Sequence, residues 1–217
     1  MPDPLTQLEA MPSPKAQEIL QAARSVFIAK GFEAASMDAV AKTAGVSKAT
    51  VYAHFKSKSD LFAAIVAQVA GRLTGEIRAI MEARLPLRQA LTRIGEHFLE
   101  MLIDPELVRM FRMMVAEADR FPDLGRIFYR AGPLVMQDCL AGFLAEAAAE
   151  GKLAIDDPAL AARQLLSLVK VDLHLRCLFD TGTQPTPAEC DRQVAAAVEM
   201  FLKAYGAPGA YGAPGAS

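Results

Sequence analysis

The sequence has few cysteines and no long apolar run, and both absences narrow its class. Three of the 217 residues are cysteine, and none belongs to a CxxC pair. An odd, widely spaced set argues against a disulfide framework or a structural zinc site and favours a reducing compartment. No uninterrupted stretch approaches the ~18 apolar residues of a membrane span. The opening MPDPLTQLEAMPSP lacks the basic and apolar segments of a signal peptide. We therefore expect a cytoplasmic protein without membrane contact.

A large net charge is also missing, although the charge is unevenly distributed. The formal net charge is −2, which argues against indiscriminate binding to nucleic acid. Residues 14–60 hold seven Lys or Arg against four Asp or Glu, whereas residues 61–217 hold sixteen against nineteen. A basic N-terminal part joined to an acidic remainder is suited to docking on DNA in one orientation.

Enzyme motifs are absent from the sequence. It contains no HExxH, no P-loop and no GxGxxG after a strand. Gly45–Ala49 resembles a nucleophile elbow only loosely, because the final glycine is missing and a helix precedes it where a strand is required. His97 lies between Glu96 and Glu100, but this spacing is common on helix surfaces and favours no metal site. We expect no catalytic residue, no metal and no cofactor.

Helical periodicity runs through the whole chain. Apolar residues recur in steps of three and four, and no segment alternates as a strand does. The pattern predicts an all-α protein. It predicts two short helices on either side of a turn at residues 44–46. Longer helices are predicted over residues 14–30, 58–84, 87–103, 105–120, about 158–181 and 187–205. Residues 122–150 are predicted to hold one or two helices, with a break at Gly132-Pro133.

The most informative stretch is Ser36–Leu61, SMDAVAKTAGVSKATVYAHFKSKSDL. Ser36 and Ser47 are placed to cap two short helices, and Gly45 falls where a helix ends in the left-handed conformation. Val51 and Phe55 lie four residues apart and are expected to point inward. The pattern is that of a helix-turn-helix, although a basic surface turn between helices is the alternative.

The residues expected to point outward on the second short helix suit DNA. Lys48 can reach a guanine edge or a phosphate, and Ala49 is small enough to let the helix sit deep in a major groove. Tyr52 and His54 can donate to phosphates. Lys58 lies in a capping box beside the free N–H groups of the next helix. The predicted DNA-binding residues are Ser36, Ser47, Lys48, Ala49, Thr50, Tyr52, His54 and Lys58.

One run of motifs matches a known family. The matching residues are Ala23, Phe27, Gly31-Phe32 and the runs 36–41, 44–52, 54–58 and 60–62. Through them, residues 15–62 resemble the N-terminal DNA-binding domain of the TetR family of bacterial transcriptional regulators. The resemblance implies an all-helical homodimer on a palindromic operator, usually a repressor released by a small ligand. Ala53 departs from the family pattern, where a larger residue often stands, and this puts one base contact in doubt.

The resemblance also suggests a domain organisation. We expect an arm at residues 1–13, a helix-turn-helix domain at 14–62, a helical ligand-binding and dimerisation domain at 63–204, and a tail at 205–217 that repeats YGAPGA. The phrases at residues 116–122, 156–158 and 172–176 resemble the AcrR-like subgroup. By the same resemblance, the last two long helices pair with their symmetry mates. The alternative is that their apolar faces only complete the core of one chain.

Methionine and phenylalanine are concentrated in the predicted body. Soft sulfurs and aromatic rings suit a pocket for varied apolar ligands, and ordinary core packing is the alternative. Polar residues on apolar helices could orient a ligand. The predicted pocket residues are His97, Phe98, Met101, Met110, Met113, Met114, Glu117, Phe128 and Asp172.

Together, these patterns predict a homodimeric transcriptional repressor with a double-stranded DNA operator and an unidentified small-molecule effector as partners. The main alternative is a small-molecule-binding or scaffold protein whose helix-turn-helix no longer reads DNA. An activator has the same sequence features, and a helical enzyme lacks a residue set that nominates a reaction.

Overall fold

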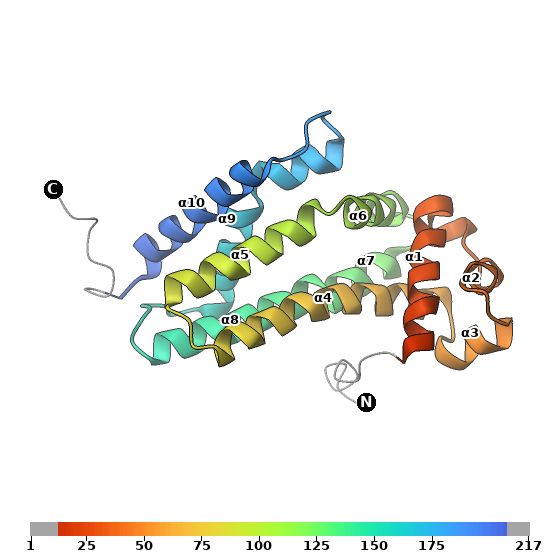
Figure 1. Ribbon diagram of the computed structural model, residues 1–217, viewed down its shortest axis with the longest axis horizontal. Helices are drawn as coiled ribbons and strands as arrows, with labels where there is room; N and C mark the ends of the chain where they lie inside the picture. Colours follow the sequence, from red (N-terminus) through yellow and green to blue (C-terminus); the bar gives the residue numbers. More distant parts are fainter. Residues whose placement is uncertain (1–12, 208–217) are drawn as a thin grey trace. The chain divides into compact units, whose positions relative to one another are not determined.

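A computed structural model describes residues 13–207 of the chain, and its regular structure there is helical (Figure 1). The predicted all-α class is confirmed. The helices are α1 (Pro14–Ala34), α2 (Met37–Ala44), α3 (Lys48–His54), α4 (Lys58–Glu82), α5 (Leu87–Ile103), α6 (Pro105–Glu117), α7 (Pro122–Ala131), α8 (Pro133–Ala149), α9 (Pro158–Phe179) and α10 (Pro187–Tyr205). The predicted break at Gly132-Pro133 separates α7 from α8. Most of the predicted arm and of the tail lies outside the described residues.

The helices form two compact units. The head unit contains the described residues up to Gly71 together with Arg109–Leu134, and the body unit contains Arg72–Val108 and the described residues from Val135 onward. This division differs from the boundary expected after residue 62. The reason is that Met110, Met114 and Leu124 are buried in the same core as the helix-turn-helix residues. The chain passes from one unit to the other within α4, α6 and α8.

Local sequence sets the ends of the short helices. The Ser36 hydroxyl accepts a hydrogen bond from the Ala39 N–H at 3.2 Å, and the Ser47 hydroxyl accepts one from the Thr50 N–H at 3.0 Å. Both serines therefore cap as predicted. Gly45 has a φ of 65°, the left-handed conformation expected for it. Gly31, with a φ of 77°, interrupts α1, and one further turn reaches Ala34.

Aromatic rings form the centre of the head unit. Phe27 and Phe62 are fully buried, and Phe32 is 3 % exposed. The Phe27 and Phe32 rings stack with centroids 5.5 Å apart, while the Phe62 ring meets both edge-on. These contacts join α1 to the start of α4, because their apolar surface is removed from water only when the two helices pack. They provide the support for α2 and α3.

In the body unit, α5, α9 and α10 lie side by side (Figure 1). Gly95 allows close packing, because a Cβ there would lie 2.9 Å from a methyl carbon of Val194. Helix α9 is interrupted at Val171, whose φ of 27° is not helical. The Gln193 side chain donates to the Leu168 carbonyl at 2.7 Å, next to this interruption. Among the described residues, no helix is long and apolar enough to span a membrane.

Candidate DNA-binding surface

The turn between α2 and α3 is held by backbone hydrogen bonds and by burial. The Val46 N–H donates to the Ala41 carbonyl at 3.0 Å, which closes the end of α2. Val40 is 1 % exposed and Val51 is fully buried in the core of the head unit. Each short helix is therefore anchored in the core by apolar side chains, and the opposite side of α3 is left to solvent.

Four of the eight predicted DNA-binding residues lie on that solvent side. Lys48, Ala49 and His54 are exposed, and Tyr52 is 45 % exposed. These four residues are the α3 surface. Thr50 is less accessible than predicted, since it is half-buried and its hydroxyl lies 2.8 Å from the Ser47 hydroxyl. The α3 surface has the size and chemistry to enter a major groove, with a lysine and a tyrosine for polar contacts and an alanine for close approach.

The side chain of Asp38, on α2, pairs with Lys48. The Lys48 ammonium lies 2.8 Å from one carboxylate oxygen of Asp38 and 3.1 Å from the other. It also lies 6.0 Å from the centroid of the Tyr52 ring. The hydrogen bond that Lys48 donates to the Asp38 carboxylate raises the pKa of Lys48. Sequence reasoning missed Asp38, because nothing in the spacing of ten residues between Asp38 and Lys48 indicates that the two helices bring these side chains together.

Lys58 has a different environment from the one expected. Its ammonium donates to the carbonyls of Phe32 and Glu33, both at 2.8 Å, and to that of Ala35 at 3.4 Å. It also lies 4.8 Å from the centroid of the Phe32 ring. A lysine has three N–H donors, and all three are directed at the C-terminal end of α1. In this structure Lys58 caps the end of α1, and its contact with a phosphate stays a prediction.

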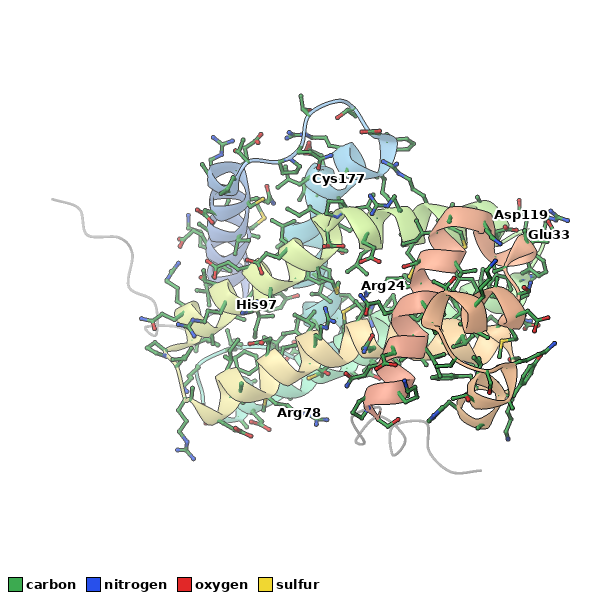
Figure 2. The ribbon with its side chains drawn as sticks, turned by 45° about the vertical axis from the view of Figure 1, so that its right-hand side comes forward. Arg24, Glu33, Arg78, His97, Asp119 and Cys177 are labelled. Atoms are coloured by element: carbon green, nitrogen blue, oxygen red, sulfur yellow. The ribbon has the colours of Figure 1, made fainter. Side chains whose placement is uncertain are left out.

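The end of α1 also contacts α6 and the residues after it. The Arg120 guanidinium forms an ion pair with both carboxylate oxygens of Glu33, and the Glu33 N–H donates to the Glu117 carboxylate at 3.5 Å. Figure 2 shows Glu33 near Asp119, which belongs to the same segment as Arg120. Glu117, predicted for the ligand pocket, is therefore bound to the end of α1 within the head unit.

The predicted pocket residues are divided between the two units. In the head unit, Met110 and Met114 are buried core residues, and the Phe128 ring meets Phe111 edge-on at 5.5 Å. Met113 packs against the same core. In the body unit, Phe98 is buried, Met101 is half-buried and Asp172 is exposed. The assignment of these residues to a pocket stays a prediction.

His97 has acidic neighbours, as its sequence context indicated, but one of them is different. Its Nδ1 lies 3.5 Å from Glu100, and its Nε2 lies 3.7 Å from Glu76 of α4. The second acidic neighbour of His97 is therefore Glu76, whereas the sequence indicated Glu96. Within residues 13–207, no group of three His, Cys, Asp or Glu side chains could hold a metal ion. Figure 2 shows His97 on α5.

Comparisons with known proteins agree with this geometry. Residues 19–65 match the family described as bacterial regulatory proteins, tetR family, and residues 89–207 match the C-terminal domain of AefR-like transcriptional repressors. A TetR-family regulator from Mesorhizobium loti is 32 % identical with a TM-score of 0.78, covering 91 % of this chain and 100 % of that one. The flavonoid-responsive regulator FrrA is 37 % identical with a TM-score of 0.67, covering 90 % and 98 %.

Several curated relatives match over a shorter part. The transcriptional activator FasR from Mycolicibacterium smegmatis is 35 % identical over 85 residues, which is 39 % of each chain. The chain thus spans well under half the length of this relative. The two family matches together extend over most of the described residues, and the second alone covers more than half of the chain. The chain belongs to the TetR family of bacterial transcriptional regulators.

Proposed function

We propose that this protein is a homodimeric repressor that binds a palindromic operator and leaves it when a small lipophilic effector binds. The observation that carries the proposal is the α3 surface. Lys48, Ala49 and Tyr52 face solvent on a helix that Val51 anchors in the core. Reading a major groove requires such a rigidly held helix with solvent-exposed polar side chains. Operator binding implies that the protein acts in the cytoplasm.

Exposed apolar residues on α9 and α10 support the homodimer. Val171, Leu175 and Phe179 follow in steps of four on α9 and are 49 %, 47 % and 78 % exposed, and Met200 on α10 is 58 % exposed. Ala195 and Ala196 of α10 are also exposed and permit close approach of another helix. Leu175 and Phe179 lie four residues apart beyond the interruption at Val171, and large apolar side chains at this spacing are typical of a helix face that packs against a partner. A second copy of the chain provides the symmetry that a palindrome requires.

One family match and one relative support the choice of repression and of a lipophilic effector. The C-terminal match is to a domain of transcriptional repressors, which favours repression although FasR is named an activator. FrrA is named for its response to flavonoids. In the proposed mechanism, the effector binds better to a conformation whose two α3 helices no longer match successive major grooves, and so shifts the population away from DNA.

The test is binding of the full chain to the DNA upstream of its own gene, measured by fluorescence anisotropy across a salt series with excess random DNA. We expect binding that survives the competitor and falls steeply with salt, because phosphate contacts release counterions. Tyr52→Ala should weaken operator binding by about tenfold or more. Tyr129→Ala is the matched control, since Tyr129 is a 49 % exposed tyrosine on α7, and it should leave the affinity unchanged.

Equal affinities of Tyr52→Ala and the unaltered protein would contradict the assignment of the α3 surface. If no sequence is enriched from a randomised DNA pool, the proposal of operator binding fails as a whole. The alternative of a ligand-binding scaffold would then lead. A lipophilic compound library, flavonoids included, tests the effector in the same assay, where an effector lowers the anisotropy of the labelled operator.

A further inference from the structure

The pair between Asp38 and Lys48 is unusual because it places a negative charge on a surface suited to DNA. Asp38 lies in the first turn of α2, and Lys48 begins α3. The Asp38 side chain is 65 % exposed and that of Lys48 is 58 % exposed. An unpaired carboxylate that faces DNA repels the phosphates and weakens binding. Another effect therefore has to offset this loss of affinity.

The exposure of both side chains limits the strength of this pair. Exposed ion pairs contribute about 0–1 kcal/mol, so DNA can rearrange the ammonium at little cost. A lysine ammonium has three donors. It can therefore keep its contact with Asp38 and still donate to a base edge.

Base edges and phosphates affect the carboxylate differently. The O6 and N7 acceptors of guanine are uncharged, and a guanine bound by Lys48 does not repel Asp38. A phosphate carries a full negative charge, and a phosphate bound by Lys48 is brought close to the Asp38 carboxylate. The Asp38–Lys48 pair thus disfavours a phosphate contact, which gives sequence-independent affinity. It tolerates a contact with a base edge, which distinguishes one sequence from another.

We propose that Asp38 is a specificity-determining residue, which holds Lys48 for a base edge and lowers affinity for random DNA by opposing a phosphate contact. The proposal rests on the proposed operator binding. The proposed role of Asp38 depends on Lys48. This dependence distinguishes it from the general rise in DNA affinity that follows the loss of any negative charge.

The experiment compares Asp38→Asn with the unaltered full chain on the selected operator and on random-sequence duplex of equal length, across a salt series. We expect the affinity for random DNA to rise about three- to tenfold and the logarithmic salt slope to steepen by about 0.9, the value for one more phosphate contact. Operator affinity should change by less than about threefold. The ratio of the two affinities therefore falls.

Two further variants make the test specific. Glu18→Gln removes another exposed carboxylate of the head unit, one that pairs with Lys15 at 2.5 Å, and so it controls for net charge. Lys48→Gln, alone and combined with Asp38→Asn, completes a double-mutant cycle. In the Lys48→Gln background, Asp38→Asn should change random-DNA affinity no more than Glu18→Gln does. Circular dichroism verifies the folded state of each variant.

The proposal is overturned if Asp38→Asn strengthens operator and random DNA by the same factor, or if its effect persists without Lys48. Either result would make Asp38 an ordinary surface charge. These outcomes are read only after the unaltered protein has bound its operator selectively. A failure of operator binding is therefore seen separately, in the unaltered protein.

Discussion

Neighbouring residues of α3 have opposite environments, and this contrast explains how a helix of seven residues is both held and exposed. Val51 is fully buried, while Tyr52, the next residue, is 45 % exposed. Successive helix positions turn by about 100°, so that one side chain enters the core and the other faces solvent. Lys58, the first residue of α4, joins α4 to α1, because its ammonium caps the carbonyls at the end of α1.

Replacing Lys58 tests whether it acts on stability or on DNA. Lys58→Met removes three donors from the end of α1, and we expect the free energy of unfolding to fall by about 1.5–3 kcal/mol, the range for hydrogen bonds to a charged group. Urea unfolding followed by circular dichroism measures the change. Lys56→Met, at an exposed position, should stay within about 0.5 kcal/mol of the unaltered protein. If Lys58→Met keeps its stability and only flattens the salt slope of operator binding, Lys58 is a phosphate contact instead.

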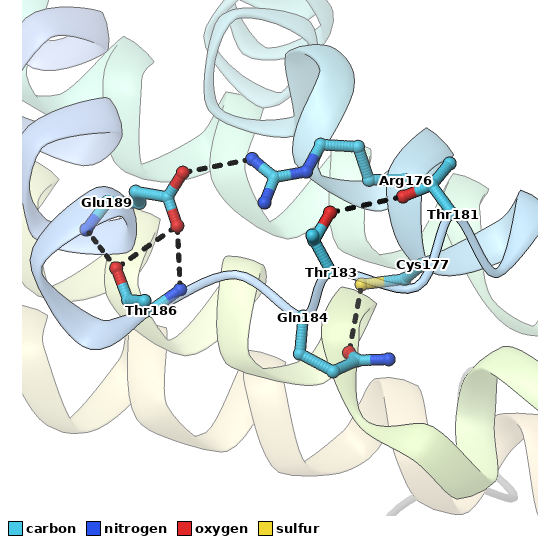
Figure 3. A network of polar contacts seen from close by, with 7 residues as sticks. All are labelled: Arg176, Cys177, Thr181, Thr183, Gln184, Thr186 and Glu189. Carbon is cyan, nitrogen blue, oxygen red and sulfur yellow. Dashed lines mark hydrogen bonds and ion pairs between the residues drawn. The ribbon is translucent and has the colours of Figure 1, made fainter.

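At the scale of elements, a polar network joins the end of α9 to the start of α10 (Figure 3). Arg176 of α9 donates to Glu189 of α10 at 3.0 Å. Thr186 and Glu189 form a reciprocal capping box, in which the Thr186 N–H donates to Glu189 at 2.9 Å and the Glu189 N–H donates to Thr186 at 3.3 Å. The network fixes the first turn of α10 and connects it to α9, which are the two helices proposed for the dimer contact.

The pH dependence of stability should report this network. The hydrogen bond from the Thr186 backbone, followed by that from Arg176, lowers the pKa of Glu189 from 4.5 to about 2. Because the pKa is depressed in the folded state, the stabilisation is complete above about pH 4.5 and is lost as the pH falls toward 2. Glu189→Gln should therefore unfold at a lower temperature than the unaltered protein at pH 6, and this difference should shrink from pH 4.5 downward.

Thermal unfolding by circular dichroism between pH 6 and pH 2.5 measures this difference. Glu146→Gln, at an exposed position of α8, serves as the control and should show no comparable trend. A Glu189→Gln difference that stays constant over the whole range would mean that the carboxylate charge contributes nothing to the network.

On the scale of the whole molecule, the exposed face of α9 and α10 determines the state of assembly that we propose. Val171, Leu175 and Phe179 offer apolar area that one chain leaves in water. Burying it against a second copy contributes roughly 25 cal/mol per Å². Helix α9 continues beyond its interruption at Val171 to Phe179. Next to the interruption, the Gln193 side chain donates a hydrogen bond to the Leu168 carbonyl.

A charge on this face should separate the dimer. Leu175→Glu places a carboxylate in the proposed contact, where burial without a partner is costly. Light scattering after size exclusion should then give the 23.3 kDa of one chain, instead of twice that mass for the unaltered protein. Val115→Glu, at a 55 % exposed apolar position on α6, should leave the mass of the dimer unchanged. A Leu175→Glu protein that stays dimeric would remove α9 from the proposed interface.

The sequence by itself determined the helices, with their ends correct to within a few residues. Periodicity predicted α5 at residues 87–103, and the structure has α5 at Leu87–Ile103. Ser36 and Ser47 were identifiable as caps, because a cap acts within three residues of its own position. The family was visible for the same reason, since the helix-turn-helix is one short continuous run.

Only the tertiary structure decided which distant residues meet. It placed most of α6 and all of α7 in the head unit, and it brought Asp38 to Lys48, Glu76 to His97 and Arg120 to Glu33. It also directed Lys58 to the end of α1. No local pattern encodes these pairs, because each depends on how the apolar faces of separate helices pack. The packing of the helices is set by the summed burial of many apolar side chains. The polar contacts then depend on where this packing places each polar side chain.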